Sequence, residues 1–323
     1  MIALIDGDIL VYKAGFAVER KIYRLFVNNE EVFLNEKLTK TSIRRYLEGN
    51  KIDRSTVRIT SRVEVDPENY AYQIVKTTIN KILDKTGSKD HKVFITSDDK
   101  SNFRFQVAKI KPYKGNRKAG KPYYYEKIRS YLKQYWQANE VSGQEADDAI
   151  GIEQCRRNLK EAVGTQDASR LWNDQCRSIS ARSEDGGVER VAETQEEFTK
   201  QSAHDSIICS IDKDLLMIPG MHYNIDKEEV IQISTEQAWR NFYGQMLTGD
   251  STDNIPGLYG VGKITAKKIL SEISDPHLMQ KAVKHWYKKC YPELSNDKLR
   301  EIFLEIGTLL WIRRKEDEIW EPL

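Results

Sequence analysis

The sequence predicts an α/β fold in which a mostly parallel central sheet is flanked by helices. Short runs rich in apolar residues at 2–5, 93–95 and 207–211 have the composition of buried strands. Each run leads into acidic residues, and helix-spaced apolar residues separate the first run from the second. Because the order strand, helix, strand is typical of an open α/β sheet, we expect the three runs to pair side by side.

The N-terminal part contains a strand, a helix and a β-rich segment. The strand at 2–5 leads into a helix that passes through Tyr12 and Phe16. Residues 22–66 then alternate β-branched and polar residues, which predicts a β-hairpin or ribbon added to the fold. No role is predicted for this insertion.

The middle of the chain combines regular elements with a long polar segment. A helix through Ile74, Ile79 and Ile82 leads to the strand at 93–95, and a third helix is expected to begin near Ser142. Residues 165–204 are polar and long for a loop, so we interpret them as a partly disordered insertion.

The chain divides into two predicted domains. Residues 1–233 would form an α/β core with insertions at about 22–66 and 165–204, and residues 234–323 would form a helical region that opens with glycine-rich turns. With 323 residues, 39% of them hydrophobic, one compact domain with insertions and two small domains are both possible.

Composition excludes several classes of protein. The four cysteines lie far apart without a C-x-x-C spacing, which argues against a zinc site and against a disulfide framework. The apolar run at the N-terminus is too short for a signal peptide, and no stretch approaches the roughly 20 apolar residues of a membrane span. We therefore expect a cytoplasmic protein without a membrane partner, and we also expect it to be a monomer.

Acidic residues gather where the predicted strands end. They are Asp6 and Asp8 after the first strand, Asp98 and Asp99 after the second, Asp212 and Asp214 after the third, and Glu145, Asp147 and Asp148 at a helix start. Because the carboxyl ends of parallel strands border the ligand crevice of an open sheet, we expect these carboxylates to converge.

Converging carboxylates predict a metal site. Two like charges about 4 Å apart repel by about 4 kcal/mol at an effective dielectric constant near 20, so the cluster needs compensating charge. Oxygen ligands select magnesium or manganese, and two such ions can bind the attacking and leaving oxygens of a phosphodiester. This pattern indicates hydrolysis without a protein nucleophile.

Each acidic motif alone also has a structural interpretation. The run 6–8 is typical of a strand-to-turn junction, and Ser142 with Glu145 matches a helix capping box. Asp212 is also a suitable cap for a short helix. Only the joint occurrence of these motifs favours the metal site.

Positive charge is concentrated in one segment. The whole chain has a net charge of +2, but residues 100–135 contain eleven Lys and Arg against one acid, Glu126, and interleave them with Phe and Tyr. Such a segment can neutralise phosphates and stack on bases. The alternative is an ordinary solvated helix face.

A glycine-rich turn at 257–263 precedes a predicted helix at 264–273. Backbone N–H groups at a helix N-terminus can bind a phosphate, and glycine allows close approach. A plain turn between helices is the alternative interpretation.

Taken together, the motifs resemble those of the 5′-nuclease superfamily, which includes flap endonucleases, the nuclease domain of bacterial DNA polymerases and phage exonucleases. The matching runs, in the family's order, are Ile5–Asp8, Phe103–Arg104, Tyr113–Arg117, Glu145–Asp148, Ser210–Asp214, Gly249–Gly257 and Gly260–Lys263. The ending 310–322 is most similar to the phage exonuclease branch.

The resemblance implies a site for two Mg²⁺ ions, with Mn²⁺ able to substitute. Its ligands would be Asp6, Asp98 or Asp99, Glu145, Asp147, Asp148, Asp212, Asp214, Asp250 and Asp253, with Asp8 in support. Strand phase slightly favours Asp98 over Asp99.

The resemblance also implies how DNA is held. Residues 100–135 would form a helical arch in which Lys114 and Arg117 act at the scissile phosphate and Arg104, Lys118 and Lys121 bind DNA. Gly257, Gly260, Gly262 and Lys263 would belong to a helix-three-turn-helix element that grips the duplex, with a monovalent cation as a further option.

The function implied is a 5′→3′ exonuclease on double-stranded DNA in phage replication or recombination. Its substrates would have a free 5′ end, a nick or a 5′ flap, and removal of RNA primers from RNA–DNA hybrids is a further option. The alternatives are a non-catalytic DNA-binding protein on a nuclease scaffold and an RNA-cutting enzyme of the related toxin type. The second leaves the basic segment unexplained.

Overall fold

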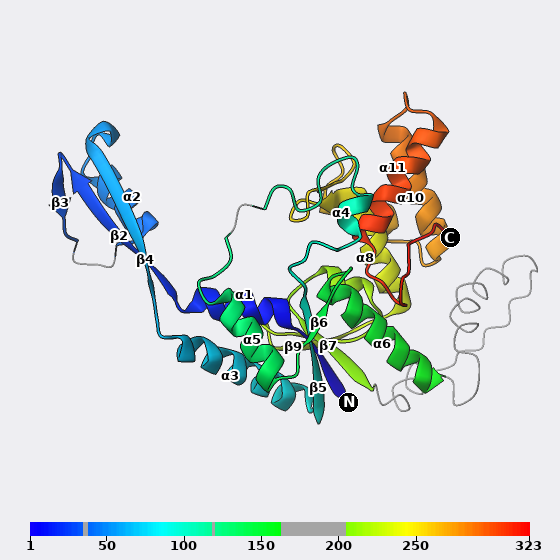
Figure 1. Cartoon of the computed structure of the whole chain (residues 1–323). Helices are drawn as coiled ribbons and strands as arrows, with labels where there is room; N and C mark the ends of the chain where they lie inside the picture. The colour runs from blue at the N-terminus through cyan, green and yellow to red at the C-terminus, as the bar shows by residue number, and fades with distance from the viewer. Residues whose placement is uncertain (35–37, 118–119, 163–204) are drawn as a thin grey trace, which may run out of the picture. The chain divides into compact units, whose positions relative to one another are not determined.

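The computed structural model describes residues 1–34, 38–117, 120–162 and 205–323, which form two compact units (Figure 1). The first unit comprises Met1–Ile9, Ile79–Ala119 and Leu132–Leu323, and the second comprises Leu10–Thr78 and Gly120–Tyr131. The predicted insertion at 165–204 and Lys118 lie outside the described residues. The domain boundary at residue 233 stays a prediction.

The first unit contains a six-stranded sheet in the order β6-β5-β1-β7-β8-β9. Its strands are β1 (Ile2–Asp6), β5 (Asp90–Thr96), β6 (Asn139–Val141), β7 (Ser206–Ser210), β8 (Gly220–Asn224) and β9 (Glu229–Ile233). Each neighbouring pair is parallel except β8 with β9. The α/β fold with a mostly parallel sheet is confirmed. β8 and the antiparallel β9, which the sequence did not predict, extend it at one edge.

Strand pairing brings the predicted acidic positions to one edge of this sheet. β1 lies in the middle and all five of its residues are buried. Asp6 pairs with Phe94 of β5, and Ile5 pairs with Cys209 of β7. Because the three strands run parallel, the residues that follow them emerge on the same side of the sheet.

Helices connect these strands along the chain. They are α1 (Gly7–Ala17), α3 (Glu68–Thr86), α4 (Arg104–Val107), α5 (Tyr125–Tyr135) and α6 (Ala146–Ala162), with the 3₁₀ turn η2 (Asp214–Met217). α6 packs against β1, β5 and β7, and its buried Ile150 contributes to the core. In the predicted arch, α4 and α5 are helical, whereas residues 111–116 form turns and bends.

The start of α6 differs from the sequence prediction. The helix begins at Ala146, and the backbone N–H of Glu145 donates to Asp148 Oδ2 at 3.0 Å. Ser142 makes no capping box, because its hydroxyl donates to Asp99 at 2.6 Å. The S-x-x-E pattern therefore predicted the wrong cap, since a distant acid binds the serine.

The C-terminal part is helical, as predicted. It contains α8 (Thr235–Thr248), α9 (Lys263–Leu270), α10 (Pro276–Cys290) and α11 (Asn296–Leu310), with the short antiparallel pair β10 (Gly249–Asp250) and β11 (Ile255–Pro256) between α8 and α9. α8 packs against α10 and α11, and Trp239, Phe242 and Trp311 form an aromatic cluster in this core. The helix-three-turn-helix assignment stays a prediction.

The second unit contains the predicted β-rich insertion. β2 (Glu19–Val27) pairs antiparallel with both β3 (Glu30–Val32) and β4 (Val57–Val65), and α2 (Lys40–Gly49) and the 3₁₀ turn η1 (Arg54–Thr56) connect β3 to β4. The ribbon is confirmed, but the strand alternation did not predict α2. No helix within the described residues of either unit is long and apolar enough to cross a membrane.

Candidate active site

Asp6 forms the centre of the acidic edge. Its Oδ1 accepts from the backbone N–H of Ile9 at 3.2 Å, and its Oδ2 accepts from the Ser210 hydroxyl at 3.0 Å. Burial, and then repulsion from Asp8, raise the pKa of Asp6 to about 7. The residue therefore both caps the start of α1 and presents a carboxylate that resists carrying a full charge.

Thr96, at the end of β5, links two parts of this edge. Its backbone N–H donates to both carboxylate oxygens of Asp8, at 3.2 and 3.1 Å, and its hydroxyl accepts from the N–H of Ala146 at 2.9 Å. Thr96 thus joins the first turn of α1, which contains Asp8, to the start of α6. The supporting role of Asp8 at a metal site stays a prediction.

Asp147 faces the acidic residues of several other elements. Burial, followed by repulsion from Asp6, Asp212 and Glu145, raises its pKa well above the ordinary aspartate value. Interactions of this kind require carboxylates within a few ångströms of one another. The carboxylates of Asp6, Asp212 and Glu145 are therefore close enough to Asp147 to interact with it, and a shared metal site stays a prediction.

A lysine lies between the acids that follow β7 and those of β10. Lys213 Nζ is 3.1 Å from Asp250 Oδ2 and 3.5 Å from Asp214 Oδ1. Burial and then repulsion from Asp212 raise the pKa of Asp214 to about 7, although Lys213 opposes this shift. The pKa of Asp250 is lowered, because the N–H of Thr252 and Lys213 outweigh its burial. Asp212 also accepts from the N–H of Asp214 at 2.8 Å, which supports the capping role considered for it, and its role as a metal ligand stays a prediction.

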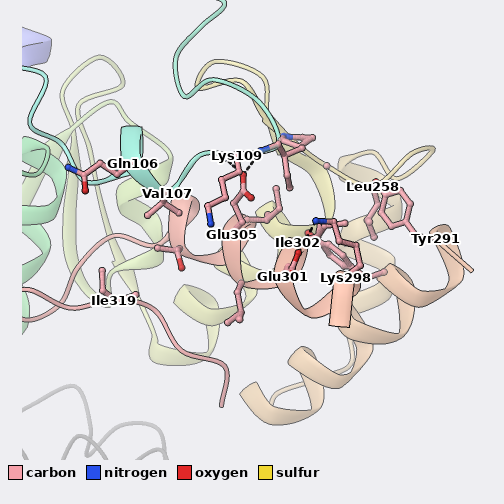
Figure 2. Close-up of a pocket in the computed structure, with 17 residues that line it drawn as sticks. Gln106, Val107, Lys109, Leu258, Tyr291, Lys298, Glu301, Ile302, Glu305 and Ile319 are labelled. Carbon is pink, nitrogen blue, oxygen red and sulfur yellow. Dashed lines mark hydrogen bonds and ion pairs between the residues drawn. The ribbon is translucent and has the colours of Figure 1, made fainter. Parts of the chain in front are cut away.

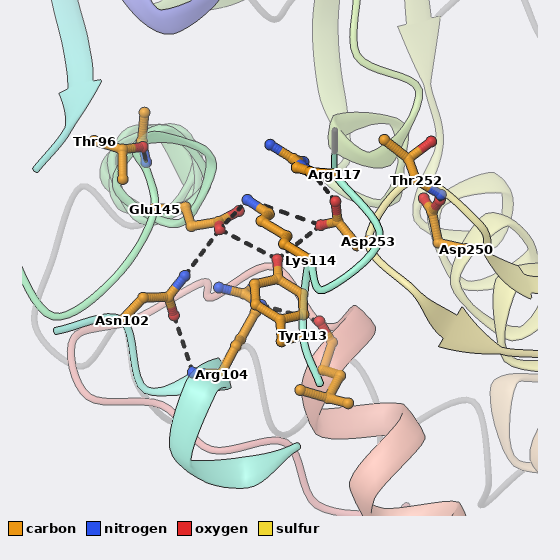
Figure 3. A network of polar contacts seen from close by, with 12 residues as sticks. Thr96, Asn102, Arg104, Tyr113, Lys114, Arg117, Glu145, Asp250, Thr252 and Asp253 are labelled. Carbon is orange, nitrogen blue, oxygen red and sulfur yellow. Dashed lines mark hydrogen bonds and ion pairs between the residues drawn. The ribbon is translucent and has the colours of Figure 1, made fainter. Parts of the chain in front are cut away.

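The predicted catalytic cations belong to a connected polar network (Figure 3). Lys114 Nζ donates to Glu145 Oε1, which also accepts from Asn102 at 2.8 Å. Arg117 donates to Asp253 Oδ1 at 2.5 Å. Lys114 and Arg117 therefore lie beside two of the predicted metal ligands.

Tyr113 holds this network together. Its hydroxyl donates to Asp253 Oδ2 at 2.7 Å and lies 3.2 Å from Glu145 Oε1 (Figure 3). Burial and then the charge of Glu145 raise the pKa of Tyr113 well above its ordinary value, so the phenol remains a hydrogen-bond donor. The side chain of Glu145 thus bonds to Asn102, Tyr113 and Lys114, which favours its role in the site over a role as a helix cap.

Two loops of the site are locked by reciprocal hydrogen bonds. Asn116 Nδ2 donates to the Ser251 carbonyl at 2.6 Å, and Asn254 Nδ2 donates to the Pro112 carbonyl at 2.9 Å. The N–H of Lys114 donates to the Asp253 carbonyl at 2.9 Å. Lys114 and Asn254 both have positive φ, 56° and 61°, a conformation that costs non-glycine residues free energy and persists only where contacts support it.

Asp148 and Arg104 bind each other. Arg104 Nη1 lies 2.6 Å from Asp148 Oδ2 and Nη2 lies 2.9 Å from Oδ1, and both residues are almost completely buried. Asp148 also accepts from the N–H groups of Glu145 and Arg313. Although burial raises the pKa of Asp148, Arg104 more than offsets it, so the net shift is downward. Arg104 further donates to the carbonyls of Leu309 and Trp311, at 2.9 and 2.6 Å.

The acids after β5 differ from the others in exposure. Asp98 and Asp99 are both exposed. Asp99 accepts from the hydroxyls of Ser101 and Ser142, at 2.5 and 2.6 Å, and the Ser101 hydroxyl in particular lowers its pKa. Neither acid is among the causes of the raised pKa values of Asp6 and Asp147.

The predicted DNA-binding glycines have different surroundings. A Cβ on Gly257 would lie 2.1 Å from the Thr248 carbonyl carbon, so close backbone packing at β10–β11 already requires glycine there. Gly260 has a φ of 75° with open space around it, and Gly262 precedes α9 in open space. Lys263 is exposed at the first position of α9. Lys121 belongs to the second unit, where its Nζ lies 4.0 Å from the centre of the Tyr125 ring.

A separate groove of about 910 Å³ lies in the first unit, between residues 106–110, the segment 256–258 and α11 (Figure 2). Its lining is mainly apolar and includes Gly257, Leu258 and Ile302. Glu305 Oε1 accepts from the N–H groups of Lys109 and Ile110, both at 2.7 Å. These hydrogen bonds fix the segment 106–110 at one side of the groove. None of the carboxylates of the acidic edge lines this groove, so we assign it no part in their chemistry.

Charge and donor chemistry test whether the acidic edge suits divalent cations. Nine carboxylates interact with one another or with a shared cation at this edge, and four cations lie among them, which leaves five formal negative charges. The cations are Arg104, Lys114, Arg117 and Lys213. The acids are Asp6, Asp8, Glu145, Asp147, Asp148, Asp212, Asp214, Asp250 and Asp253. Two divalent ions would cancel four of them. Hard oxygen donors and uncompensated negative charge both fit Mg²⁺.

The side chains are nevertheless not drawn together as a ligand cage. Within the described residues, no three His, Cys, Asp or Glu side chains are grouped so that they could hold one ion. Several of the carboxylates are bound by Lys114, Arg117 and Lys213 instead. An ion that bound here would have to compete with these ammonium and guanidinium groups.

Sequence reasoning missed several residues that organise the site. Tyr113 and Lys213 lie inside recognised motifs, so their positions between acids were a usable signal. Asn116 and Asn254 also lie inside recognised motifs, but their hydrogen-bond partners are distant in the chain and could not be predicted, and Asn102 lies outside the motifs.

The chain was compared with known proteins. No protein-family model matches it. A stretch of 119 residues is 30% identical to a DNA polymerase I of Rhizobium leguminosarum, and this match covers 34% of the chain and 11% of the polymerase. The chain therefore corresponds to a small part of that protein.

Solved structures similar to the chain come from bacteriophage T5. They include a protein co-crystallised with metal ions (14% identity, TM-score 0.47, 96% of this chain and 88% of that chain) and a 5′-exonuclease with bound zinc (13%, 0.42, 96% and 86%). A third is a flap endonuclease in a pseudo-enzyme–product complex with DNA and metal ions (12%, 0.41, 96% and 98%). Two of these three structures are thus named as a 5′-exonuclease and a flap endonuclease.

Proposed function

We propose that the chain is a divalent-metal-dependent nuclease that hydrolyses phosphodiester bonds from the 5′ ends of double-stranded DNA. The observation that carries this proposal is the proximity of Asp6, Asp147 and Asp212: Asp6 and Asp212 both raise the pKa of Asp147, and Asp212 also raises that of Asp6. A protein that only binds DNA gains nothing from a cluster of carboxylates that repels phosphates. The partial match to a DNA polymerase I agrees with DNA as the substrate.

The acidic edge would hold two Mg²⁺ ions, with Mn²⁺ able to substitute. We propose as ligands the set that the resemblance implies, with Asp6, Asp147, Asp212 and Asp214 as its core because burial and neighbouring carboxylates raise the pKa of each of the four. When bound, such ions supply a nucleophile from water near neutral pH and stabilise the charge of the leaving oxygen.

Lys114 and Arg117 would bind the reacting phosphate. Both cations already lie next to acids of the site, and the Arg117 side chain is 47% exposed, so an incoming phosphate can reach it. Their fixed positive charge would offset the charge that develops on the phosphoryl oxygens. Tyr113 would keep Glu145 and Asp253 in place through its hydroxyl.

The DNA beyond the cut would be held by the turn before α9. Gly260, Gly262 and Lys263 present an open helix N-terminus, which suits a backbone phosphate. A monovalent cation at this turn, 5′-flap cleavage and removal of RNA primers are parts of the proposal that follow from the motif resemblance alone.

A cleavage assay tests the proposal. The purified chain should release short products from 5′-labelled blunt duplex, nicked duplex and 5′-flap DNA when Mg²⁺ is present, and none after EDTA is added. The Asp147→Asn variant should bind the same DNA without cutting it. Equal cleavage with and without EDTA, or by the variant, would refute the metal-dependent site.

A further inference from the structure

The inserted sheet of the second unit has no part in the proposed cleavage chemistry. β2, β3 and β4 form a three-stranded antiparallel sheet in the order β3-β2-β4. Side chains alternate between the two faces of such a sheet, and directly paired residues share a face. The strand register therefore shows which side chains stand together.

One face of this sheet carries four arginines, and we call it the arginine face. Arg20 pairs with Glu64, Ile22 with Arg62, Arg24 with Thr60, and Phe26 with Arg58. Glu31 of β3 pairs with Phe26 and lies on the same face. Four guanidinium groups thus share this face with the carboxylates of Glu31 and Glu64, and Arg20 also pairs with Asp66, the residue after β4.

The opposite face supplies the small core of the inserted segment. Leu25 pairs with Val32 and Ile59 on that face, and Leu25 is completely buried. Ile43 of α2 is buried as well, at 2% exposure. All four arginines of the arginine face are exposed.

The arginines of this face are available to a new partner. Arg20 is paired with Asp66, Arg24 lies 3.6 Å from Glu31, and Arg62 lies 2.6 Å from Glu64, yet more than half of each arginine side chain is exposed. Exposed ion pairs of this kind contribute about 0–1 kcal/mol, so a more highly charged anion can replace them.

Arg58 combines charge with an aromatic surface. Its guanidinium lies 4.1 Å from the centre of the Phe26 ring. A stacked guanidinium is held in place while its N–H groups stay directed outward, which suits binding of phosphate oxygens. Within the part of the chain that the structure describes, Arg58 makes no ion pair.

We propose that the arginine face binds the sugar–phosphate backbone of DNA. Arg20 and Arg24 are four residues apart on one strand, which is about 13 Å at 3.3 Å per residue, so the face is long enough to contact several phosphates. Its excess of guanidinium groups is complementary to a polyanion. This surface lies outside the acidic site and would add affinity for the substrate without acting on the scissile bond. The inference shares with the proposed function only the assumption that the partner is DNA.

The test is a binding measurement on the full chain in EDTA, which prevents cleavage. Fluorescence anisotropy with a labelled DNA duplex would be recorded over a range of salt concentrations for the parent protein and for Arg24→Gln/Arg58→Gln. Each lost phosphate contact lowers the slope of log affinity against log salt by about 0.9, so the double variant should lower it by nearly two and bind more weakly at every salt concentration.

A matched control removes two charges elsewhere in the same segment. Arg44 and Arg45 lie on α2, outside the three-stranded sheet, and both are exposed. Arg44→Gln/Arg45→Gln should leave the slope unchanged. Equal losses in both double variants, or no loss in either, would overturn the proposal. The single variant Arg62→Gln should give about half of the effect, and unchanged thermal unfolding would show that the variants fold.

Because binding is read without metal, failure of this inference is distinguishable from failure of the nuclease assignment. A protein whose Arg24→Gln/Arg58→Gln variant binds DNA as the parent does, while the parent still cuts DNA with Mg²⁺, would retain its proposed activity and lose only the arginine face.

Discussion

Arg104 and Asp148 form a buried bidentate ion pair that joins α4 to the first turn of α6. The two nitrogen–oxygen distances are 2.6 and 2.9 Å, and the side chains are 1% and 0% exposed. Arg104 also donates to the carbonyls of Leu309 and Trp311, so this pair fixes the C-terminal segment against the site. The motif resemblance assigned Arg104 to DNA binding and Asp148 to metal binding. In the structure these two side chains bind each other and stabilise the packing of α4, α6 and the C-terminal segment.

Asp148→Asn should destabilise the protein strongly. Loss of one partner leaves the Arg104 charge buried and uncompensated, which typically costs about 3–5 kcal/mol. The free energy of unfolding in urea, measured in EDTA, would show this loss. A change below about 1 kcal/mol would contradict the structural role.

Asp147→Asn should have the opposite effect on stability. Its carboxylate is repelled by Asp6 and Asp212, so neutralising it removes an unfavourable interaction from the metal-free protein. We expect unchanged or higher stability in EDTA together with a loss of cleavage of about 100-fold or more, the order of magnitude typical when a group that stabilises transition-state charge is removed. Equal destabilisation by the Asp147 and Asp148 variants would disprove the division of roles between these neighbours.

Asn254 should position Lys114 for catalysis without touching the substrate. Asn254→Gly keeps the positive φ accessible but removes the hydrogen bond to the Pro112 carbonyl, which is worth about 1 kcal/mol. We expect kcat to fall with little change in KM, because the loop that carries Lys114 loses one of its anchors.

Asn50→Gly is the matched control for Asn254→Gly. Asn50 also donates through Nδ2 to a backbone carbonyl, that of Tyr46, but it lies in the second unit. Its variant should leave kcat unchanged. If both variants reduced kcat equally, the data would contradict a specific role of Asn254 in positioning Lys114.

His222 should make stability fall at acidic pH. Its ring nitrogen Nε2 lies 2.8 Å from the Ile218 carbonyl, and burial lowers its pKa from 6.5 to about 4. The unfolded chain therefore binds the proton first, and stability decreases as pH falls from 6.5 towards 4. The full difference of about 2.5 pKa units corresponds to about 3 kcal/mol.

His222→Gln is the measurement that isolates this effect. Glutamine can still donate to the Ile218 carbonyl but does not titrate. The raised pKa values of Asp6 and Asp214 act with the opposite sign in the same range, so the difference between the two unfolding profiles is the quantity to compare. Parallel profiles between pH 6.5 and 4 would contradict the assignment.

Local patterns in the sequence were sufficient for the frame of the site. An apolar run followed by Asp6 predicts a buried strand with an acid at its end, and the same pattern at Ile207–Asp212 predicts a second. Their convergence followed from a general property of parallel sheets. The β-ribbon was also visible, because alternation over nine residues depends only on the local chain.

Pairing partners were not predictable in this way. The capping pattern at Ser142 failed because Asp99, 43 residues away, accepts from the hydroxyl. Asp148 stands beside Asp147 in the same motif, but its carboxylate oxygens bind Arg104, which lies 44 residues away in the chain. Neither contact leaves a trace in the local spacing of residues.

The sequence by itself determined which strands end in acids, where positive charge is concentrated and which residues alternate in the insertion. These features depend on the 2-residue and 3.6-residue periods of strands and helices and on composition. The tertiary structure alone decided which acids repel one another, which are neutralised by Arg104 or Lys213, and which arginines share one face of the inserted sheet. Those properties depend on distances between segments remote in the chain, and electrostatic and hydrogen-bond energies are set by such distances and by burial.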